Sequence, residues 1–326
     1  MYPRSILLIK PGSMGDVIHA LPVASAIHEA WPDSKITWII DPRWRPLLDG
    51  NPAVFKTHDF PRQSFRGLAG KLRAVRWYSE LANLRPDLVI DLQGLLRSGL
   101  MAKTSGAKNV IGLSDSREFA SLFYTKVVEV GQKEHAVTRY LRCLPALGIK
   151  IPEKIDFTFP KQKLTQHIEI EHEYVVVHPF ARGEMKSLSA EAILAMTAEL
   201  ALSANIQVVI AGVGDVPFGI GPSVVNLVGK TSLQELVGLL RGARFVVSVD
   251  SGPMHLAAGL GVPVLGIHTW SDPRLVGPYS KESWIWQGGE LCRQELLRIP
   301  LPERTFTVED ARNVARFVAE RVSCPG

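Results

Sequence analysis

Three turns in the sequence combine small, charged and hydroxyl side chains in patterns that suit phosphate binding or proton transfer. The first is KPGSMGD, Lys10 to Asp16, which follows a short apolar run and precedes a helical pattern. Its two glycines allow a sharp turn, and a helix start offers unpaired N–H groups to an anion. The spacing matches neither a dinucleotide fingerprint nor a P-loop. Asp16 is therefore either the N-cap of the next helix or a general base at a strand end.

The second turn, Ser248 to His255, also joins an apolar run to a helical pattern. Ser251 and Gly252 suit a phosphate at a helix N-terminus, although Ser251 is equally suited to plain capping. Asp250 would repel phosphate and instead accept hydrogen bonds from hydroxyl groups or backbone donors. His255 is either a hydrogen-bond donor to phosphate or a buried core histidine.

Two further stretches carry basic groups. In the third turn, His178 to Lys186, Lys186 either stabilises a phosphate leaving group or is a solvated surface lysine. The stretch from Arg43 to Arg85 holds nine basic residues against three acidic ones. Such a segment faces an anion or a membrane surface, or is a solvated helix face.

Two successive α/β patterns position these turns. Continuous apolar runs followed by turns are typical of buried parallel strands, and amphipathic stretches between them predict helices. Residues 150–172 are rich in proline and charge and are predicted to link the two halves. Strands are expected at Ser5–Ile9, Ile36–Ile40, Leu88–Asp91, Asn109–Gly112, Val127–Val130, Tyr174–His178, Gln207–Ala211, Phe245–Val249 and Val264–Ile267; helices are expected at Val17–Ala30, Ala190–Leu202, Leu233–Leu240, Pro253–Leu260 and Thr307–Val322.

Composition narrows the class of protein. The 326 residues are 46% hydrophobic and 21% charged, which excludes disorder over most of the chain and suits two domains. The net charge of +5 is unevenly shared, because residues 1–150 hold 21 basic and 13 acidic side chains and residues 151–326 hold 16 and 19. The first half is therefore the one expected to meet an anion. The three cysteines lack metal or redox spacing, and no apolar run approaches the roughly 18 residues of a membrane span.

Four segments in order resemble the family 9 glycosyltransferases, the lipopolysaccharide heptosyltransferases. These are the KPGSMGD turn, Val89 to Leu95 with its Asp-Leu-Gln-Gly sequence, Ser116 to Tyr124 followed by His135 to Val137, and the segment that begins at Ser248. The third of them resembles the heptosyltransferase I branch in particular. The matches extend from residue 6 to about residue 280, so the resemblance covers most of the chain.

The resemblance implies a GT-B fold, an α/β architecture of two Rossmann-like domains whose parallel sheets face a central cleft. Residues 1–155 would bind the acceptor, residues 156–305 the nucleotide-sugar, and residues 306–326 would form a helix that crosses back to the first domain. The implied reaction moves L-glycero-D-manno-heptose from ADP-heptose to Kdo on lipid A, with inversion. No metal or other cofactor is expected, and the oligomeric state is left open.

The resemblance also implies roles for particular residues. Asp16 would be the general base, and Lys186 would assist departure of the diphosphate. The residues matched to acceptor binding are Gln93, Arg117 and Arg139, with the cluster Arg62, Arg66 and Arg73; those matched to donor binding are Ser13, Gly15, Lys186, Asp215, Asp250, Ser251, Gly252 and His255. The anionic lipid acceptor predicts a cytoplasmic protein held peripherally at the inner membrane, although the sequence shows no amphipathic anchor.

The sequence departs from the family at two places and leaves alternatives open. Lys186 is followed by Ser-Leu-Ser where family members have Trp and Pro, and the acidic residue that binds the donor ribose is matched only by Asp215. A heptosyltransferase II-like enzyme, or another family 9 transferase with a different acceptor, is the main alternative. A non-catalytic carbohydrate- or lipid-binding protein is a second one. A nucleotide-dependent oxidoreductase and a nucleic-acid-binding protein are disfavoured, because their motifs are absent from the sequence.

Overall fold

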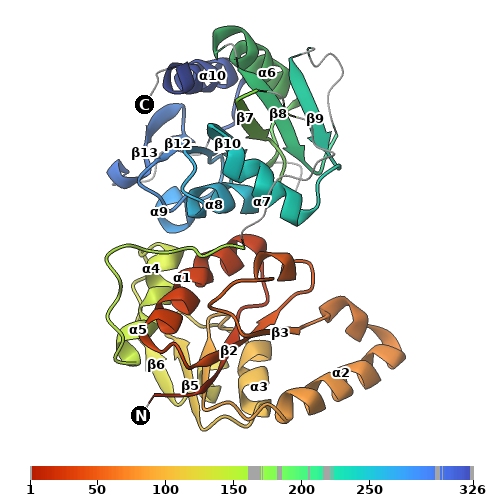
Figure 1. Ribbon diagram of the computed structural model, residues 1–326, viewed down its shortest axis with the longest axis vertical. Helices are drawn as coiled ribbons and strands as arrows, with labels where there is room; N and C mark the ends of the chain where they lie inside the picture. Colours follow the sequence, from red (N-terminus) through yellow and green to blue (C-terminus); the bar gives the residue numbers. More distant parts are fainter. Residues whose placement is uncertain are drawn as a thin grey trace. The chain divides into compact units, whose positions relative to one another are not determined.

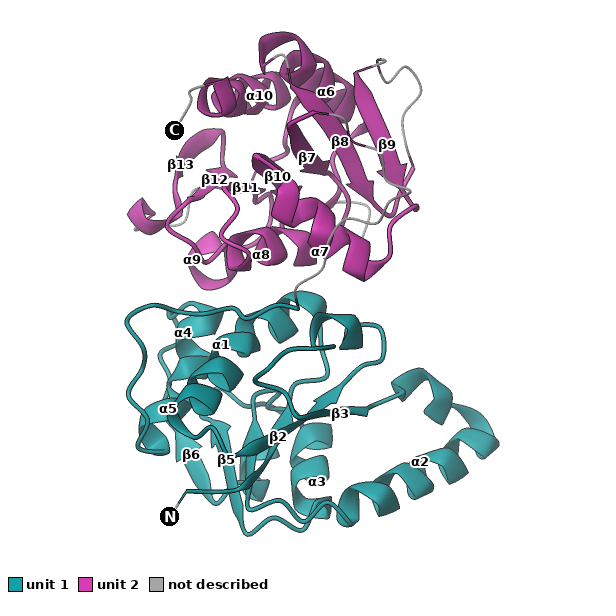
Figure 2. Cartoon of the chain, viewed as in Figure 1, with its two compact units in different colours: residues 1–161 teal, residues 162–326 magenta. Residues whose placement is uncertain are grey.

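Two compact α/β units make up the chain, Met1–Lys161 and Gln162–Gly326 (Figure 2). The division falls inside the predicted linker, six residues beyond the predicted boundary at residue 155. The computed structural model describes residues 2–160, 170, 172–181, 186–204, 206–215, 221, 223–297, 302 and 304–323. Residues 182–185 of the third turn and most of the 217–222 loop lie outside that part.

The first unit is built on a six-stranded, wholly parallel sheet in the order β3-β2-β1-β4-β5-β6 (Figure 1). The chain fills the sheet outward from β1 in one direction and then from β4 in the other, so the order reverses between these two strands. Buried residues on both faces explain the continuous apolar runs in the sequence. The strands are β1 (Ser5–Ile9), β2 (Lys35–Ile40), β3 (Lys56–Asp59), β4 (Leu88–Asp91), β5 (Asn109–Leu113) and β6 (Lys126–Val128).

Helices cover both faces of this sheet. In one group, α4 and α5 pack on α1; the other group is formed by α2 and α3 (Figure 1). α1 is apolar around most of its circumference, as expected of a helix buried between a sheet and other helices. The helices are α1 (Met14–Ala30), α2 (Gly67–Ala82), α3 (Leu96–Thr104), α4 (Ala136–Leu141) and α5 (Cys143–Ala146), with the 3-10 turns η1 (Arg45–Leu47), η2 (Arg62–Phe65) and η3 (Ala120–Phe123).

The second unit repeats the design with seven strands in the order β13-β12-β11-β10-β7-β8-β9. Only β13 runs antiparallel to its neighbour among the described pairs, and the order reverses between β7 and β10. The elements are β7 (Tyr174–His178), α6 (Ala190–Ala204), β8 (Gln207–Gly212), β9 (Val224–Val228), α7 (Leu233–Gly242), β10 (Phe245–Val249), α8 (Gly252–Gly259), β11 (Val264–Ile267), α9 (Pro273–Val276), β12 (Ser283–Gln287), β13 (Glu290–Arg293), η5 (Gln294–Leu296) and α10 (Val308–Ser323).

The last helix, α10, is capped as the sequence predicts and packs on its own unit. Thr307 and Asp310 form the predicted cap, since the Thr307 backbone N–H donates to the Asp310 carboxylate at 2.9 Å. The apolar face of α10 packs on α6 and enters the core of the second unit through Val314 and Val318. This helix therefore packs within the second unit. The apolar stripe of α10 is buried in the core of the second unit. A contact between residues 306–326 and the first domain stays a prediction.

No helix among the described residues has the length and apolarity that a membrane span needs.

Candidate active site

In the first unit the polar residues gather where the strand order reverses. Parallel pairing sets Ile9 of β1 opposite Asp91 of β4, so the residues that follow these strands emerge side by side. Lys10 bridges the two strand ends, because its ammonium donates to the carbonyl of Leu92 at 2.9 Å. In open α/β sheets, ligands bind beyond the carboxyl ends of the strands at this kind of reversal.

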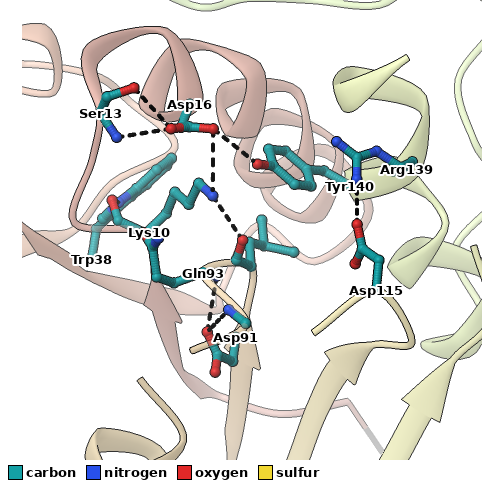
Figure 3. Close-up of polar contacts among 11 residues, drawn as sticks. Lys10, Ser13, Asp16, Trp38, Asp91, Gln93, Asp115, Arg139 and Tyr140 are labelled. Atoms are coloured by element: carbon teal, nitrogen blue, oxygen red, sulfur yellow. Dashed lines mark hydrogen bonds and ion pairs between the residues drawn. The ribbon is translucent and has the colours of Figure 1, made fainter. Parts of the chain in front are cut away.

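Asp16 lies above that bridge, on the first turn of α1 (Figure 3). One carboxylate oxygen accepts from the Ser13 backbone N–H at 2.9 Å and from its hydroxyl at 2.8 Å. The other accepts from the Tyr140 hydroxyl at 3.3 Å and lies 3.7 Å from the Lys10 ammonium. The N-cap is Ser13, so Asp16 is not the cap that its position in the sequence allowed.

These contacts set the charge of Asp16. Burial alone would raise its pKa, but Lys10 and the donors of Ser13 outweigh burial, and the pKa lies below its usual value. Burial likewise opposes the charge on Lys10, whose pKa is nonetheless raised by its neighbours, Asp16 among them. Lys10 is 3% exposed, whereas the Asp16 side chain remains 39% exposed. The site thus offers an ionised, oriented carboxylate that a ligand can reach.

Asp91 is a structural carboxylate beneath the site (Figure 3). It is fully buried and accepts from the backbone N–H groups of Gln93 and Gly94 and from the Tyr124 hydroxyl at 2.8 Å. Burial raises its pKa in spite of these donors. Gly94 has a positive φ of 65°, which the turn beyond β4 requires of a glycine. Asp91 therefore shapes the Gln93 turn.

The predicted acceptor residues Gln93, Arg117 and Arg139 all lie around this turn. The Arg117 backbone N–H donates to the Gly94 carbonyl at 2.7 Å, and its side chain is exposed. The buried Gln93 Oε1 has no hydrogen-bond partner among the described residues. Arg139 precedes Tyr140 and pairs with Asp115 (Figure 3). The structure thus brings three of the six predicted acceptor residues to the edge that holds Asp16.

The other three predicted acceptor residues, Arg62, Arg66 and Arg73, lie on η2 and α2. All three are exposed, and the Arg73 side chain donates from Nε to the Ser64 carbonyl at 2.9 Å. Burial lowers the pKa of the Arg97 guanidinium, and the positive charge of nearby Arg62 lowers it further. Arg62 therefore lies near α3, whereas Arg66 is the N-cap of α2.

In the second unit the predicted donor residues also meet at the strand reversal. Parallel pairing sets His178 of β7 opposite Ser248 of β10. The Ser251 hydroxyl, at the N-cap of α8, lies 3.4 Å from His178 Nδ1 and 3.3 Å from the Ser248 hydroxyl. Burial lowers the pKa of His178 to about 4, so it is neutral at neutral pH. Ser251 and Gly252 accordingly present the start of an eight-residue helix beside neutral polar groups.

Asp250 and His255 lie on either side of that helix start. The Asp250 backbone N–H donates to the Ile267 carbonyl at 3.1 Å, which fixes the turn between β10 and α8. His255 Nε2 is 4.0 Å from an Asp250 carboxylate oxygen. His255 is buried, as one of its two predicted interpretations requires, so it supports the turn from inside.

The remaining predicted donor residues, Lys186 and Asp215, follow β7 and β8. The Lys186 ammonium lies 3.4 Å from the centre of the Trp270 ring, so Lys186 is not a freely solvated lysine. Asp215 is exposed after a turn that packs on Phe180, where a Cβ on Gly214 would lie 2.3 Å from the Phe180 ring. Ser13 and Gly15, also predicted for donor binding, lie in the first unit, where Gly15 is buried inside α1.

Sequence reasoning missed several residues of these sites. Lys10 belonged to the first turn but received no role of its own, and nothing in the spacing connected it with Tyr140, 130 residues away. His178 and Trp270 come together with predicted residues only through the strand order. Within the described part of the chain, no group of three or more His, Cys, Asp or Glu side chains is placed to hold a metal ion.

Comparison with known proteins shows the family of the chain. The sequence model of glycosyltransferase family 9 (heptosyltransferase) matches residues 75–298. Lipopolysaccharide heptosyltransferase 1 of Escherichia coli is 28% identical over 312 residues, which cover 88% of this chain and 93% of that protein. Lipopolysaccharide heptosyltransferase 3 of Escherichia coli is 23% identical over 295 residues, covering 84% of this chain and 86% of that protein.

A solved structure extends the likeness to the fold. The structure of E. coli heptosyltransferase WaaC with ADP has a TM-score of 0.78 and 26% identity, and the match covers 97% of this chain and 99% of that chain. The likeness and the two Rossmann-like sheets confirm the predicted GT-B class.

Proposed function

Because this chain belongs to glycosyltransferase family 9, we propose that it transfers L-glycero-D-manno-heptose from ADP-heptose to a Kdo residue of the lipid A inner core. The chain is an enzyme of that family, and its relatives are named for heptosyl transfer in lipopolysaccharide. The solved relative named above holds ADP. The donor and acceptor named here extend those likenesses to this chain.

Asp16 is the general base of the proposed reaction. An acceptor hydroxyl attacks the anomeric carbon of heptose, the bond from that carbon to the diphosphate oxygen breaks, and the hydroxyl proton passes to Asp16. One displacement inverts the anomeric centre and releases ADP. The supporting observation is a carboxylate held at both oxygens by Ser13 and Tyr140 yet 39% exposed at the end of a parallel sheet.

The low pKa of Asp16 bears on the order of events. A carboxylate of low pKa is ionised at neutral pH but is a weak base. It gains little by taking the proton before the hydroxyl has become acidic through bond formation to carbon. We therefore infer that the bond to ADP begins to break first, which gives an oxocarbenium-like transition state. The hydroxyl then attacks, and its proton passes to Asp16 only after that attack has begun.

The second unit supplies the proposed donor site. Ser251 and Gly252 offer backbone N–H groups at the start of α8, where a diphosphate is favoured. Lys186 adds a positive charge that stabilises the departing ADP, and Trp270 holds its ammonium in place. Asp250 and Asp215 are assigned to hydroxyl groups of the donor, with Ser13 and Gly15 at the turn that carries the base.

The first unit supplies the proposed acceptor site. Arg117 and Arg139 lie beside the Gln93 turn, next to the base, and suit the carboxylate of Kdo. The basic residues Arg62, Arg66 and Arg73 are assigned to the phosphate groups of the lipid. A lipid acceptor places the protein at the cytoplasmic face of the inner membrane.

Release of ADP tests the proposal. Purified protein with ADP-heptose and Kdo-lipid A should release ADP, and the release should depend on both substrates. Release with a heptose-terminated acceptor alone would favour the alternative acceptor, which the likeness to a heptosyltransferase 3 keeps open. Binding of ADP-heptose without transfer to any acceptor would favour a non-catalytic nucleotide-sugar-binding protein.

A further inference from the structure

Helix α2 carries an apolar stripe that faces away from its own unit. Leu68, Leu72 and Val75 are 83%, 74% and 69% exposed. They follow one another at spacings of four and three residues, so they lie on one side of the helix. Figure 1 shows α2 at the outer edge of the first unit, beyond β3.

The opposite side of α2 packs against the first unit and holds the helix in place. Trp77 is buried among aromatic rings that include Phe60 and Phe65, and its indole N–H donates to the Asp59 carbonyl at 2.6 Å. Gly70 lies so close to Phe65 that a Cβ there would be 2.3 Å from its backbone carbon. Leu68, Leu72 and Val75 take no part in this packing, so the exposed stripe is not needed to hold α2 in place.

Basic side chains border the stripe. At 100° per residue, Lys71 and Arg76 flank the stripe on its two sides. Arg73 is also exposed on this helix, and Arg66 is exposed at its N-cap. The acidic residue of α2 is Glu80, which pairs with Arg76 at 3.1 Å. An apolar face bordered by cationic side chains is the pattern of helices that lie in the surface of a bilayer.

We propose that α2 is an interfacial anchor that inserts Leu68, Leu72 and Val75 into an anionic lipid surface, with Lys71 and Arg76 on its headgroups. A lipid surface is favoured over a second copy of the chain, because two such helices would bring their cationic borders together. The proposed function calls for a nearby membrane, and the anchor names the element that touches it. The anchor rests on α2 alone and does not require a particular sugar or donor.

Vesicle flotation tests the apolar part. The full chain should float with vesicles of phosphatidylglycerol and phosphatidylcholine, and the triple variant Leu68→Ser, Leu72→Ser, Val75→Ser should partition at least about tenfold more weakly. Leu202→Ser is the matched control, because Leu202 is 84% exposed on α6 of the other unit. This control should float as the parent does, and thermal melts should show that all three proteins are folded.

The charged part has its own variants. Lys71→Gln and Arg76→Gln should each weaken partition into the anionic vesicles by about fivefold, since a basic residue near such a surface contributes that much. Neither variant should alter partition into phosphatidylcholine alone. The effect should shrink at high salt, because screening shortens the reach of the headgroup charge.

The outcomes separate the anchor from the proposed function. The triple variant should keep the parent's rate on an acceptor stripped of its acyl chains and lose rate on acceptor held in vesicles. Flotation is measured without any turnover, so a chain that transfers no heptose still reports on the anchor. Equal flotation of the parent and the triple variant would overturn the proposal. So would a parent dimer that dissociates in the triple variant, because the stripe would then bind a second copy.

Discussion

Replacing Lys10 by Met should shift the titration of Asp16. Methionine keeps the length and apolar packing of the lysine stem but removes its charge. The Lys10 ammonium lies 3.7 Å from the Asp16 carboxylate, and it is a cation that keeps the pKa of Asp16 below its usual value. Without it, burial acts with less opposition, so the pKa of Asp16 should rise.

The distance sets the size of the shift. Two unit charges at 3.7 Å interact by about 4.5 kcal/mol at an effective dielectric constant of about 20. The Asp16 side chain is 39% exposed, and solvent screening removes much of that interaction. A remainder of about 1.4 kcal/mol corresponds to one pKa unit. The acid limb of the pH–rate profile should therefore move upward by about one pH unit.

The assay is the pH dependence of kcat/KM for ADP release by the parent and by Lys10→Met. Lys35→Met is the control, because Lys35 is an exposed lysine of the same unit that lies over the Phe55 ring. The control should keep the parent profile. Unfolding measured at the same pH values separates titration of Asp16 from loss of the fold. An acid limb that stays in place in folded Lys10→Met would refute the assigned pairing.

Three further predictions concern stability and binding. The pKa of buried His178 is lowered to about 4 and that of His268 to about 3, so the unfolded chain takes up protons first as pH falls below about 6.5. The free energy of unfolding should therefore fall by about 3 kcal/mol per histidine as the pH drops from about 6.5 towards about 4. Denaturant titration at about pH 7 and about pH 4.5 measures this loss. Gly214→Ala should weaken ADP binding measured by calorimetry, with a cost of about 1–3 kcal/mol in stability, because its Cβ would collide with Phe180. Arg117→Gln should raise the acceptor KM about fivefold and leave the donor KM unchanged in steady-state assays.

The sheets could be predicted because their strands are buried on both faces. β7, β10 and β11 have the predicted bounds, since a continuous apolar run of four or five residues rich in valine and isoleucine favours a buried strand over a helix. β3 was missed because Lys56 to Asp59 is polar and forms an edge strand. β12 was missed because its apolar run, Trp284 to Trp286, is only three residues long and lies between Ser283 and Gln287.

The site could be predicted only in part, because its contacts join distant segments. The sequence shows Asp16 after a strand and a turn, but a first-turn carboxylate has the same local pattern whether it caps a helix or performs chemistry. Asp16 does accept from the Ser13 backbone N–H as a capping-box residue, and its contacts with Tyr140 and Lys10 come only through strand order and helix packing. The same limit hid the contact between Ser251 and His178.

Helix α2 shows a different limit. Its sequence has two interleaved apolar stripes, one through Trp77 and Leu81 and one through Leu68 and Leu72. The helical period alone makes either stripe equally suited to face a core. Only the packing of Trp77 under Phe60 and Phe65 decides which stripe is buried. The sequence therefore showed the basic residues of this helix but no amphipathic anchor.

The central claim is that Asp16 removes the proton of the acceptor hydroxyl, and one substitution tests it directly. Asp16→Asn keeps the size of the side chain but removes its basicity. Single-turnover transfer of heptose should slow by about 10²- to 10⁴-fold, the range expected for loss of a general base. The dissociation constant for ADP-heptose should remain close to that of the parent. Transfer at the parent rate by folded Asp16→Asn would contradict the account.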